Sequence, residues 1–294
     1  MTTRHGTRTF STLKHEQGHW DTSISKTTNG MLRCLLSYVS YKRKGVDALA
    51  REMATVSPAF VLDAGAGKGA YAHWFLGKKK ATIIAIDWSF AALRELCAPQ
   101  QGRILPVCAD LQMLPFKSGV ANGLFSIDTL GHLNNCEMAL DEFLRVCKPS
   151  SPIFIHSECG DYQSRWPDKR LIARLHKDVL ADYDGHVSLH RAEELYRLYS
   201  RRFHVLSFIN PAGYFGWLLG YPEKYRMAFA AAHFAPMTFI TFIFAKLKRL
   251  PFIGMKVRCL NAFTNHCEVF FGLKGGGSCF AMLKKPDQDS QDKN

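Results

Sequence analysis

Residues 61–71 read Val-Leu-Asp-Ala-Gly-Ala-Gly-Lys-Gly-Ala-Tyr, and the predicted fold follows from this stretch. An apolar segment leads into glycines at every second position, and residues that suit the start of a helix come next. Glycine adopts positive φ angles and lets the backbone approach a ligand closely, because it has no Cβ. The stretch therefore predicts a strand, a tight ligand-binding turn and the first turn of a helix.

Strand and helix signals alternate along the rest of the chain. Apolar runs predict strands at residues 59–63, 81–87, 104–110, 123–128, 152–157, 203–210 and 278–284. Continuous apolar strands that alternate with helices are typical of a parallel sheet covered on both faces. The predicted fold class is therefore α/β, a Rossmann-like seven-stranded mostly parallel sheet with helices on both faces.

The same pattern divides the chain into segments. We expect an N-terminal arm and helix at 1–57, a Rossmann-like domain at 58–210, an apolar helical insertion at 211–274, the final strand of the same sheet at 275–286 and a polar tail at 287–294. Two helical stretches, 166–182 and 189–202, follow the fifth strand. The insertion thus precedes the last strand.

Four of the predicted strands end in an aspartate, namely Asp63, Asp87, Asp110 and Asp128. Ligands of such sheets bind at the carboxyl ends of the strands, so these acids are expected around one crevice. Asp87 lies about twenty residues after the glycines, where an acid binds the ribose diol of an adenosine cofactor. The glycine spacing also fits the dinucleotide fingerprint, so the loop alone does not choose between cofactors.

Later motifs narrow the choice. Residues 109–116 place an acid before a Leu-Pro-Phe turn, Leu130-Gly131-His132 follows the fourth strand, and residues 145–151 end a helix before the fifth. With the 61–69 loop and Asp87, in this order, they resemble the class I S-adenosylmethionine-dependent methyltransferases, particularly the ubiquinone/menaquinone-type small-molecule enzymes. The resemblance covers residues 60–158 and implies a Rossmann-like enzyme with S-adenosyl-L-methionine as cofactor.

Two pairs depart from the family pattern: Asn122-Gly123 opens the fourth strand, and Ser150-Ser151 replaces the customary Gly-Gly. Neither pair lies where the cofactor is expected. The residues that the resemblance assigns to the cofactor are Asp63, Gly65, Gly67, Asp87, Trp88, Ala109, Asp110, Leu111, Asp128 and Thr129. By that likeness Asp87 holds the ribose hydroxyls, Asp110 accepts from the adenine amino group, and Asp128 lies beside the methionine end.

Methyl transfer from a sulfonium is an in-line displacement that mainly requires positioning. A base is needed only when the acceptor is a hydroxyl or an acidic carbon. The candidates near the ends of the fourth and fifth strands are His132, Glu158 and Asp161. A hydrogen bond within the loop remains an alternative role for His132, and solvated loop acids remain an alternative for the two carboxylates.

Residues 228–245 are almost wholly apolar and just reach the length of a membrane span. A single crossing is excluded if the last strand returns to the same sheet. Three interpretations stay open: a lid over a hydrophobic acceptor, a segment lying in the membrane interface, or ordinary packing in the core or a dimer. Basic residues in 246–258 favour contact of 228–258 with anionic headgroups. The first two interpretations imply a lipid-, quinone- or polyketide-like acceptor.

The remaining composition bears on partners and compartment. The net charge of +13 raises RNA or a protein as alternative methylation targets. Because no basic stripe interleaved with aromatic residues is present, no nucleic acid is expected. Nine cysteines without a CxxC pair and without zinc-site spacing predict free thiols, no metal and a cytoplasmic protein, with peripheral membrane association under the interface interpretation. A non-catalytic cofactor-binding sensor or scaffold stays open as a further alternative.

Overall fold

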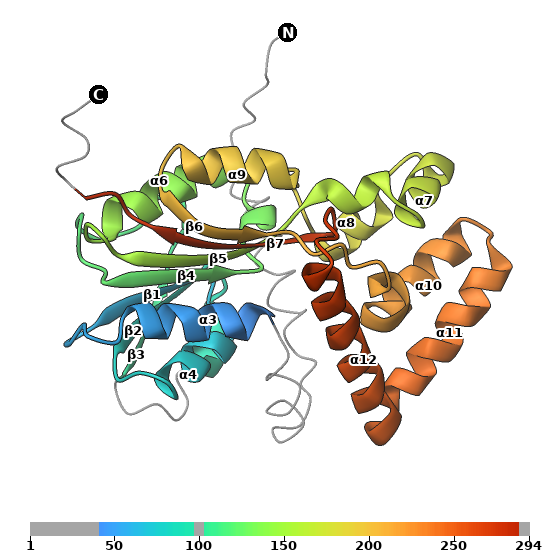
Figure 1. Cartoon of the computed structure of the whole chain (residues 1–294), viewed down its shortest axis with the longest axis horizontal. Helices are drawn as coiled ribbons and strands as arrows, with labels where there is room; N and C mark the ends of the chain where they lie inside the picture. The colour runs from blue at the N-terminus through green and yellow to red at the C-terminus, as the bar shows by residue number, and fades with distance from the viewer. Residues whose placement is uncertain (1–40, 97–102, 288–294) are drawn as a thin grey trace, which may run out of the picture.

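A computed structural model describes residues 41–96 and 103–287 of the chain. Its centre is a seven-stranded sheet in the order β3-β2-β1-β4-β5-β7-β6 (Figure 1). The strands are β1 (Phe60–Ala64), β2 (Thr82–Asp87), β3 (Ile104–Cys108), β4 (Gly123–Ile127), β5 (Pro152–Glu158), β6 (His204–Ile209) and β7 (Ser278–Lys284). Only β7 runs against its neighbours, β5 and β6. The predicted fold class is confirmed: a mostly parallel, Rossmann-like sheet.

Helices cover both faces of this sheet. The helices are α3 (Tyr41–Glu52), α4 (Ala70–Leu76), α5 (Phe90–Leu96), α6 (Cys136–Val146), α7 (Asp168–Leu175), α8 (Val179–Asp184), α9 (Ala192–Ser200), α10 (Pro222–Ala231), α11 (Ala235–Arg249) and α12 (Pro251–Phe270). Three short turns, η1 (Leu130–His132), η2 (Gly160–Ser164) and η3 (Gly216–Gly220), connect them. Figure 1 shows α6 and α9 on one face of the sheet and α3 and α4 on the other.

Each face has its own hydrophobic core. Phe143 of α6 and Tyr199 of α9 are fully buried in one core, and Leu49 of α3 and Phe75 of α4 are fully buried in the other. Burying an aromatic or leucine side chain in this way contributes roughly 1.5–3 kcal/mol of transfer free energy. The two layers thus hold the sheet rigid, with its carboxyl edge free to carry a site.

The two departures from the family pattern have structural reasons. A Cβ on Gly123 would lie 2.5 Å from Met53 Sδ, so glycine allows the end of α3 to pack against the start of β4. Asn122 accepts a hydrogen bond from the backbone N–H of Phe60 at 3.0 Å and so ties β4 to β1. Ser151 donates to the carbonyl of Ala121 at 3.1 Å. All of these contacts are at the amino-terminal ends of strands.

Two predicted helical stretches are each divided into two helices. Residues 166–182 become α7 and α8, separated by His176 with a φ of 54°. The apolar stretch 228–245 is divided between α10 and α11, where His233 also has a φ of 54°. Within the described residues, no helix is both long and apolar enough to cross a membrane.

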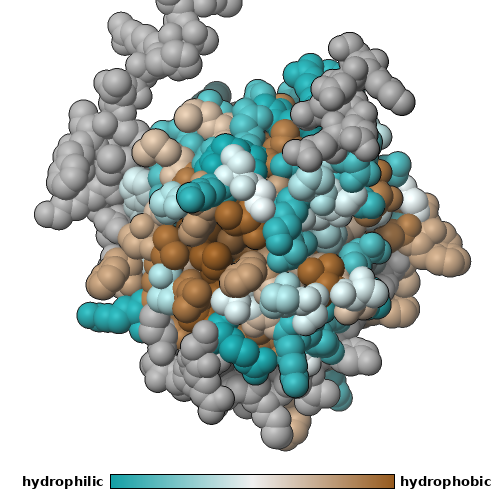
Figure 2. All heavy atoms as spheres, turned by 90° about the vertical axis from the view of Figure 1, so that its left-hand side faces the viewer, coloured by the Kyte–Doolittle hydropathy of each residue, from teal (hydrophilic) through white to brown (hydrophobic). Residues whose placement is uncertain are grey.

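The chain leaves the sheet after β6 and returns to it as β7. Helices α10, α11 and α12 lie between these strands in the sequence and project beyond the carboxyl ends of the parallel strands (Figure 1). Figure 2 shows the opposite side, where the parallel strands begin; hydrophobic side chains gather near its middle among hydrophilic ones. The insertion therefore stands on the side of the sheet where ligands of such folds bind.

Candidate active site

The glycine turn has the backbone geometry that its sequence predicts. Gly65, Gly67 and Gly69 have φ angles of 85°, 52° and 72°. A Cβ on Gly65 would lie 2.1 Å from the Oγ1 atom of Thr129, so the turn packs against the residues that follow β4. A Cβ on Gly67 would meet nothing within 4 Å. The turn thus presents bare backbone at Gly67 while Gly65 holds it close to β4.

The strand-end acids lie on four neighbouring strands at one edge of the sheet. Asp63 belongs to β1 and Asp87 ends β2, whereas Asp110 and Asp128 follow β3 and β4. Asp87 accepts hydrogen bonds from the backbone N–H groups of Gly67 at 2.7 Å and of Ser89 at 2.8 Å. Its carboxylate therefore links the glycine turn to the end of the second strand.

Asp63 is the most deeply buried of these acids, with 2% of its surface exposed. Its Oδ2 atom has no hydrogen-bond partner among the described residues. Burial, and then the nearby charge of Asp87, raise its pKa well above the ordinary aspartate value. A buried carboxyl with one unpaired oxygen favours a ligand that brings a cationic donor, which fits the ammonium group of S-adenosylmethionine.

The residues expected around the adenine lie at the same edge. The backbone N–H of Ala109 donates to the carbonyl of Asp87 at 3.2 Å, which ties the end of β3 to β2. Asp110 accepts from the backbone N–H of Gln112 at 2.9 Å, and Leu111 is buried. Trp88 is half-buried. The structure thus brings together the cofactor residues expected from β2 and β3.

A charged cluster follows β4. Asp128, whose φ is 58°, forms an ion pair with Lys42 of α3. Its Oδ1 atom also lies 2.9 Å from Nδ1 of His156, a side chain on β5 with only 1% exposure. Burial alone would raise the pKa of Asp128, but Lys42 and then His156 outweigh it and hold that pKa well below the ordinary value. Asp128 is therefore ionised at neutral pH.

Glu158, at the end of β5, lies beside this cluster. Burial and then the charge of Asp128 raise its pKa well above the ordinary glutamate value. Its Oε2 atom finds no hydrogen-bond partner among the described residues. Of the two neighbouring carboxyl groups, Glu158 therefore holds a proton more readily than Asp128 does.

Two histidines complete the cluster. His132 of η1 donates from Nδ1 to the carbonyl of Gly185 at 3.1 Å, and its ring lies 4.7 Å from the ring of His186. His186 follows α8, and its Nε2 atom is 3.9 Å from Oε1 of Glu158. Burial, and then the neighbouring His132, lower the pKa of His186 to about 4, so its ring is neutral at pH 7.

Asp161 does not join this cluster. Its carboxylate accepts a hydrogen bond at 2.7 Å from the backbone N–H of Ala192, the first residue of α9. An acid in this position satisfies an unpaired N–H and interacts favourably with the helix dipole. Asp161 also does not line the neighbouring cavity. The structure therefore places the Asp161 carboxylate at the start of α9 and away from the cluster, and its expected role as a base stays a prediction.

A cavity of about 440 Å³ opens beside these groups. Its polar side is formed by the cluster after β4 and β5, and its walls are aromatic. The aromatic lining residues are Tyr41, Tyr162, Trp166, Tyr214, Trp217, Tyr221, Tyr225 and Phe280. Several belong to η3 and α10, so the insertion forms part of the cavity wall. The volume is within the range of sites for small organic molecules.

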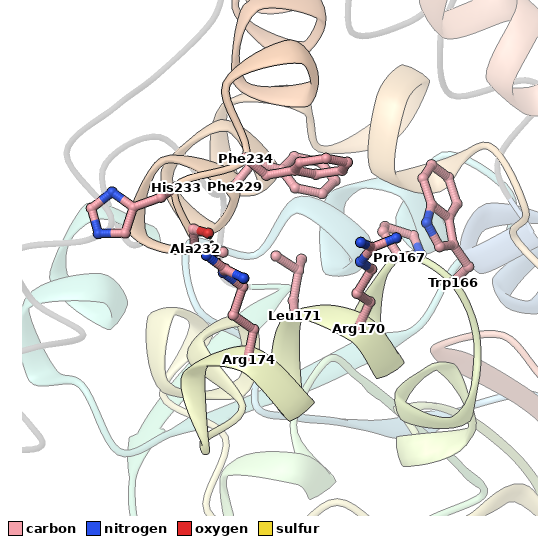
Figure 3. Close-up of a pocket in the computed structure, with 9 residues that line it drawn as sticks. All are labelled: Trp166, Pro167, Arg170, Leu171, Arg174, Phe229, Ala232, His233 and Phe234. Carbon is pink, nitrogen blue, oxygen red and sulfur yellow. Dashed lines mark hydrogen bonds between the residues drawn. The ribbon is translucent and has the colours of Figure 1, made fainter.

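A second, smaller cavity of about 100 Å³ adjoins the first at Trp166 and Pro167, which line both. In Figure 3, Leu171 of α7 points toward Phe229 and Phe234 across this space. Trp166 contacts Trp217 edge to face, with ring centroids 5.0 Å apart. The aromatic pair thus stands where the two cavities meet.

Two residues of this site were not predicted from the sequence. Lys42 reaches Asp128 from α3, across 86 positions of the chain. His186 reaches Glu158 from the segment between α8 and α9. Neither carries a local motif; the only signal was that Lys42 belongs to a short basic cluster at residues 42–44.

Comparisons with known proteins agree with this geometry. Residues 62–155 match the family described as methyltransferase domain. The chain is 30% identical over 138 residues to O-methyltransferase cnsE of Penicillium expansum, covering 44% of this chain and 49% of that protein. It is 28% identical over 122 residues to O-methyltransferase resE of Aspergillus sclerotiorum, covering 40% and 46%. The chain thus spans about half the length of these relatives.

The fold is also found among solved structures. One is phosphoethanolamine N-methyltransferase 2 of Haemonchus contortus in complex with S-adenosyl-L-methionine, with a TM-score of 0.57 and 13% identity over 96% of this chain and 61% of that chain. At that identity the likeness concerns the fold. Together with the matched domain and the glycine turn, it leads to one assignment. Residues 62–155 of this chain thus carry a methyltransferase domain, on the fold of the class I S-adenosylmethionine-dependent methyltransferases.

Proposed function

We propose that the chain transfers a methyl group from S-adenosylmethionine to a hydroxyl oxygen of a small, largely aromatic acceptor. The observation that carries this proposal is the 440 Å³ cavity, which has aromatic walls and places ionised Asp128 and the imidazole of His132 on its polar side. Aromatic walls favour a planar apolar molecule, and a few convergent polar groups orient its reacting atom. Both matched relatives are O-methyltransferases, which supports oxygen as the acceptor atom.

The cofactor and acceptor regions adjoin each other. Gly65 packs on Thr129, and the next residue back along the chain, Asp128, lines the cavity. When bound, S-adenosylmethionine supplies a methyl group on a positively charged sulfur. A lone pair of the acceptor would bond to the methyl carbon, in line with the carbon–sulfur bond, and the sulfur would leave. The chain's own contribution is to hold the acceptor oxygen on that line and to exclude water behind aromatic side chains.

His132 is the residue that we assign to removal of the hydroxyl proton. Because its Nδ1–H donates to the carbonyl of Gly185, the lone pair of the neutral ring is on Nε2. Glu158 is less suited to this task, since burial and the charge of Asp128 raise its pKa and so oppose the ionised form that a base requires. This refines the prediction from the sequence, which considered His132 and Glu158 side by side.

The test is a turnover assay with isotope-labelled S-adenosylmethionine and three matched acceptors: an aromatic alcohol or phenol, the corresponding amine, and the corresponding methyl ether. We expect a labelled O-methyl product from the first acceptor only. The His132→Gln variant should lower kcat by about 100-fold, whereas His190→Gln, outside the cavity lining, should match the wild type. Methylation of the amine alone, or of RNA or protein substrates, would overturn the proposal in favour of another acceptor class. Cofactor binding without turnover on the whole panel would favour a sensor or scaffold.

We further propose that the insertion is both a lid over the acceptor and a contact with an anionic lipid surface. Trp217, Tyr221 and Tyr225 of the insertion line the cavity, which supports the lid. The turn between α11 and α12 lies far from the sheet and exposes Leu250, Phe252 and Ile253 (Figure 1). Phe252 has 78% of its surface exposed. We call these three residues the hairpin tip.

The charge around the hairpin tip supports an anionic partner. The surrounding residues 246–260 contain Lys246, Lys248, Arg249, Lys256 and Arg258 and no acidic residue. Exposed apolar side chains flanked by cations are the features that hold peripheral proteins at anionic headgroups, with each basic residue contributing about 1 kcal/mol near the surface. A surface of this kind would also supply an apolar acceptor directly to the cavity.

A further inference from the structure

We propose that His132, Glu158 and His186 bind a divalent transition-metal ion at the polar side of the acceptor cavity. One donor atom from each of these side chains lies within 4.8 Å of the others. They come from η1, from the end of β5 and from the segment after α8, so three separate parts of the fold converge on one point. The sequence predicted no metal, because the three residues have no ligand spacing.

The burial of these side chains is the second observation. Only 8% of the side chain of His186 and 16% of that of Glu158 are exposed. Nδ1 of His186 and Oε2 of Glu158 have no hydrogen-bond partner among the described residues. Leaving such a group unpaired costs about 1–3 kcal/mol, and a bound ion or an ordered water at the Glu158 carboxyl would explain its unpaired oxygen. The proposed ligand atom of His186 is Nε2, so its unpaired Nδ1 is not counted as support for the ion.

His132 is also held in an orientation that suits a metal ligand. A ligand histidine must be neutral, and it commonly donates its other ring N–H to a carbonyl that fixes the ring. His132 makes such a bond, from Nδ1 to Gly185. Metal–ligand bonds of roughly 2.0–2.2 Å require donor atoms about 3 Å apart. Nε2 of His186 and Oε1 of Glu158 are 3.9 Å apart, and the donor atom of His132 lies within 4.8 Å of both, so rotations of these side chains would bring the three atoms to ligand spacing.

The donor set selects the class of ion. Two imidazoles and one carboxylate suit Zn²⁺, Fe²⁺, Co²⁺ or Mn²⁺, whereas Mg²⁺ and Ca²⁺ prefer oxygen ligands. A second group, Asp128, His156 and Glu158, also lies within 4.8 Å. That group is less suited, because Lys42 already pairs with Asp128 and its charge opposes a cation. The ion would therefore bind on the His186 side of Glu158.

The role of the ion in catalysis rests on the proposed function, but its binding does not. An ion at this point faces the cavity and would lower the pKa of an acceptor hydroxyl that reaches it, so that the proton is lost to water before the oxygen attacks the methyl group. Coordination by Nε2 of His132 and proton transfer to that same atom exclude each other. The ion would therefore activate the hydroxyl in the metal-bound chain, and Nε2 of His132 would do so in the metal-free chain.

The experiment is equilibrium dialysis of the chelator-treated full chain against Co²⁺ alone, with visible absorption reporting nitrogen ligation. We expect one ion per chain, and an affinity at least about tenfold lower in both His186→Gln and His132→Gln. His190→Gln is the matched control and should bind as the wild type does. Binding of S-adenosylhomocysteine shows that each variant is folded, and if His186→Gln does not fold, His132→Gln carries the test.

Three results would overturn the inference: no Co²⁺ bound by the wild type, equal binding by all variants, or loss of binding in His156→Gln with none in His186→Gln. These readouts use neither acceptor nor turnover. A chain that binds the ion and methylates nothing would refute the proposed function and leave the metal site standing. A chain that methylates its acceptor after complete removal of metal, and binds no Co²⁺, would refute the metal site and leave the proposed function standing.

Discussion

Lys42 and Asp128 form an ion pair between α3 and the residue that follows β4, at the edge of the acceptor cavity. The Lys42 side chain is 25% exposed and that of Asp128 is 40% exposed. The pair therefore joins the helix that precedes the glycine turn to the place where cofactor and acceptor are expected to meet. It also keeps Asp128 ionised next to His156 and Glu158.

Replacing Lys42 should affect both stability and the site. In Lys42→Met the carboxylate of Asp128 loses its cation, so its pKa should rise and its proton should compete with that of Glu158. Because Asp128 is partly exposed, we expect a loss of about 1–2 kcal/mol in the free energy of unfolding, less than for a fully buried pair. Urea denaturation at neutral pH measures it, with Lys44→Met on the same helix as the control. Equal stability of the two variants would show that the pair contributes nothing.

The glycine turn gives a sharper comparison between two residues. Gly65→Ala would place a Cβ 2.1 Å from Thr129 Oγ1, whereas Gly119→Ala meets nothing within 4 Å at a similar φ of 67°. Both substitutions carry the strain of a left-handed alanine, about 1–2 kcal/mol. Only Gly65→Ala should also weaken binding of S-adenosylhomocysteine, by at least about tenfold, a loss of about 1.4 kcal/mol. Calorimetric titration of both folded variants distinguishes the effects, and equal affinities would remove Gly65 from the cofactor site.

The carboxyl of Asp63 should lower the stability of the folded chain at neutral pH and strengthen its binding of S-adenosylmethionine. Its pKa is raised in the folded chain, so the folded state binds its proton more tightly than the unfolded state does. The free energy of unfolding therefore falls as pH rises through the window between the ordinary aspartate value and the raised one, by up to about 1.4 kcal/mol per pH unit. Asp63→Asn lacks this loss. We expect Asp63→Asn to be more stable than the wild type at pH 7, and this difference in stability should be smaller at pH 4. The variant should also bind S-adenosylmethionine more weakly.

The control for this comparison is Asp141→Asn, on the exposed face of α6, where the carboxylate pairs with Arg202. Its effect on cofactor affinity should be nil. If Asp63→Asn destabilised the chain at pH 7 and left cofactor affinity unchanged, the carboxyl would have a structural role only.

The hairpin tip should determine attachment to lipid. Phe252→Glu places a charge at a residue with 78% exposure, so we expect little change in thermal stability. Sedimentation with vesicles of phosphatidylserine and phosphatidylcholine should recover the wild type and lose this variant. Vesicles of phosphatidylcholine alone should recover neither. Leu206→Glu, with 51% exposure on β6, is the control and should sediment like the wild type. Sedimentation of Phe252→Glu with anionic vesicles would refute the lipid contact.

The sequence was sufficient for the sheet and for the residues that follow its parallel strands. The glycine turn and the strand-end acids Asp63, Asp87 and Asp110 could be placed because each is adjacent in sequence to the strand that positions it. The topology of such sheets then brings the strand ends together. Lys42 and His186 could not be found in this way, since each reaches the site from a helix or loop remote from any motif.

Two neighbouring acids show the same limit at closer range. Glu158 and Asp161 are three residues apart, and by sequence both follow the fifth strand. The η2 turn carries Asp161 toward the start of α9, while Glu158 remains on β5 beside Asp128. The apolar stretch 228–245 was likewise long enough for one helix, but the left-handed backbone of His233 divides it. Such turns depend on tertiary packing, which the local pattern does not record.

We expect the turn at Gly65–Gly69 and the carboxylates at the neighbouring strand ends to bind a sulfonium nucleoside. Isothermal titration of the wild-type chain with S-adenosylhomocysteine, and separately with NAD, tests it most directly. We expect one binding site for S-adenosylhomocysteine and at least about tenfold weaker binding of NAD. Tight binding of NAD with none of S-adenosylhomocysteine would contradict it.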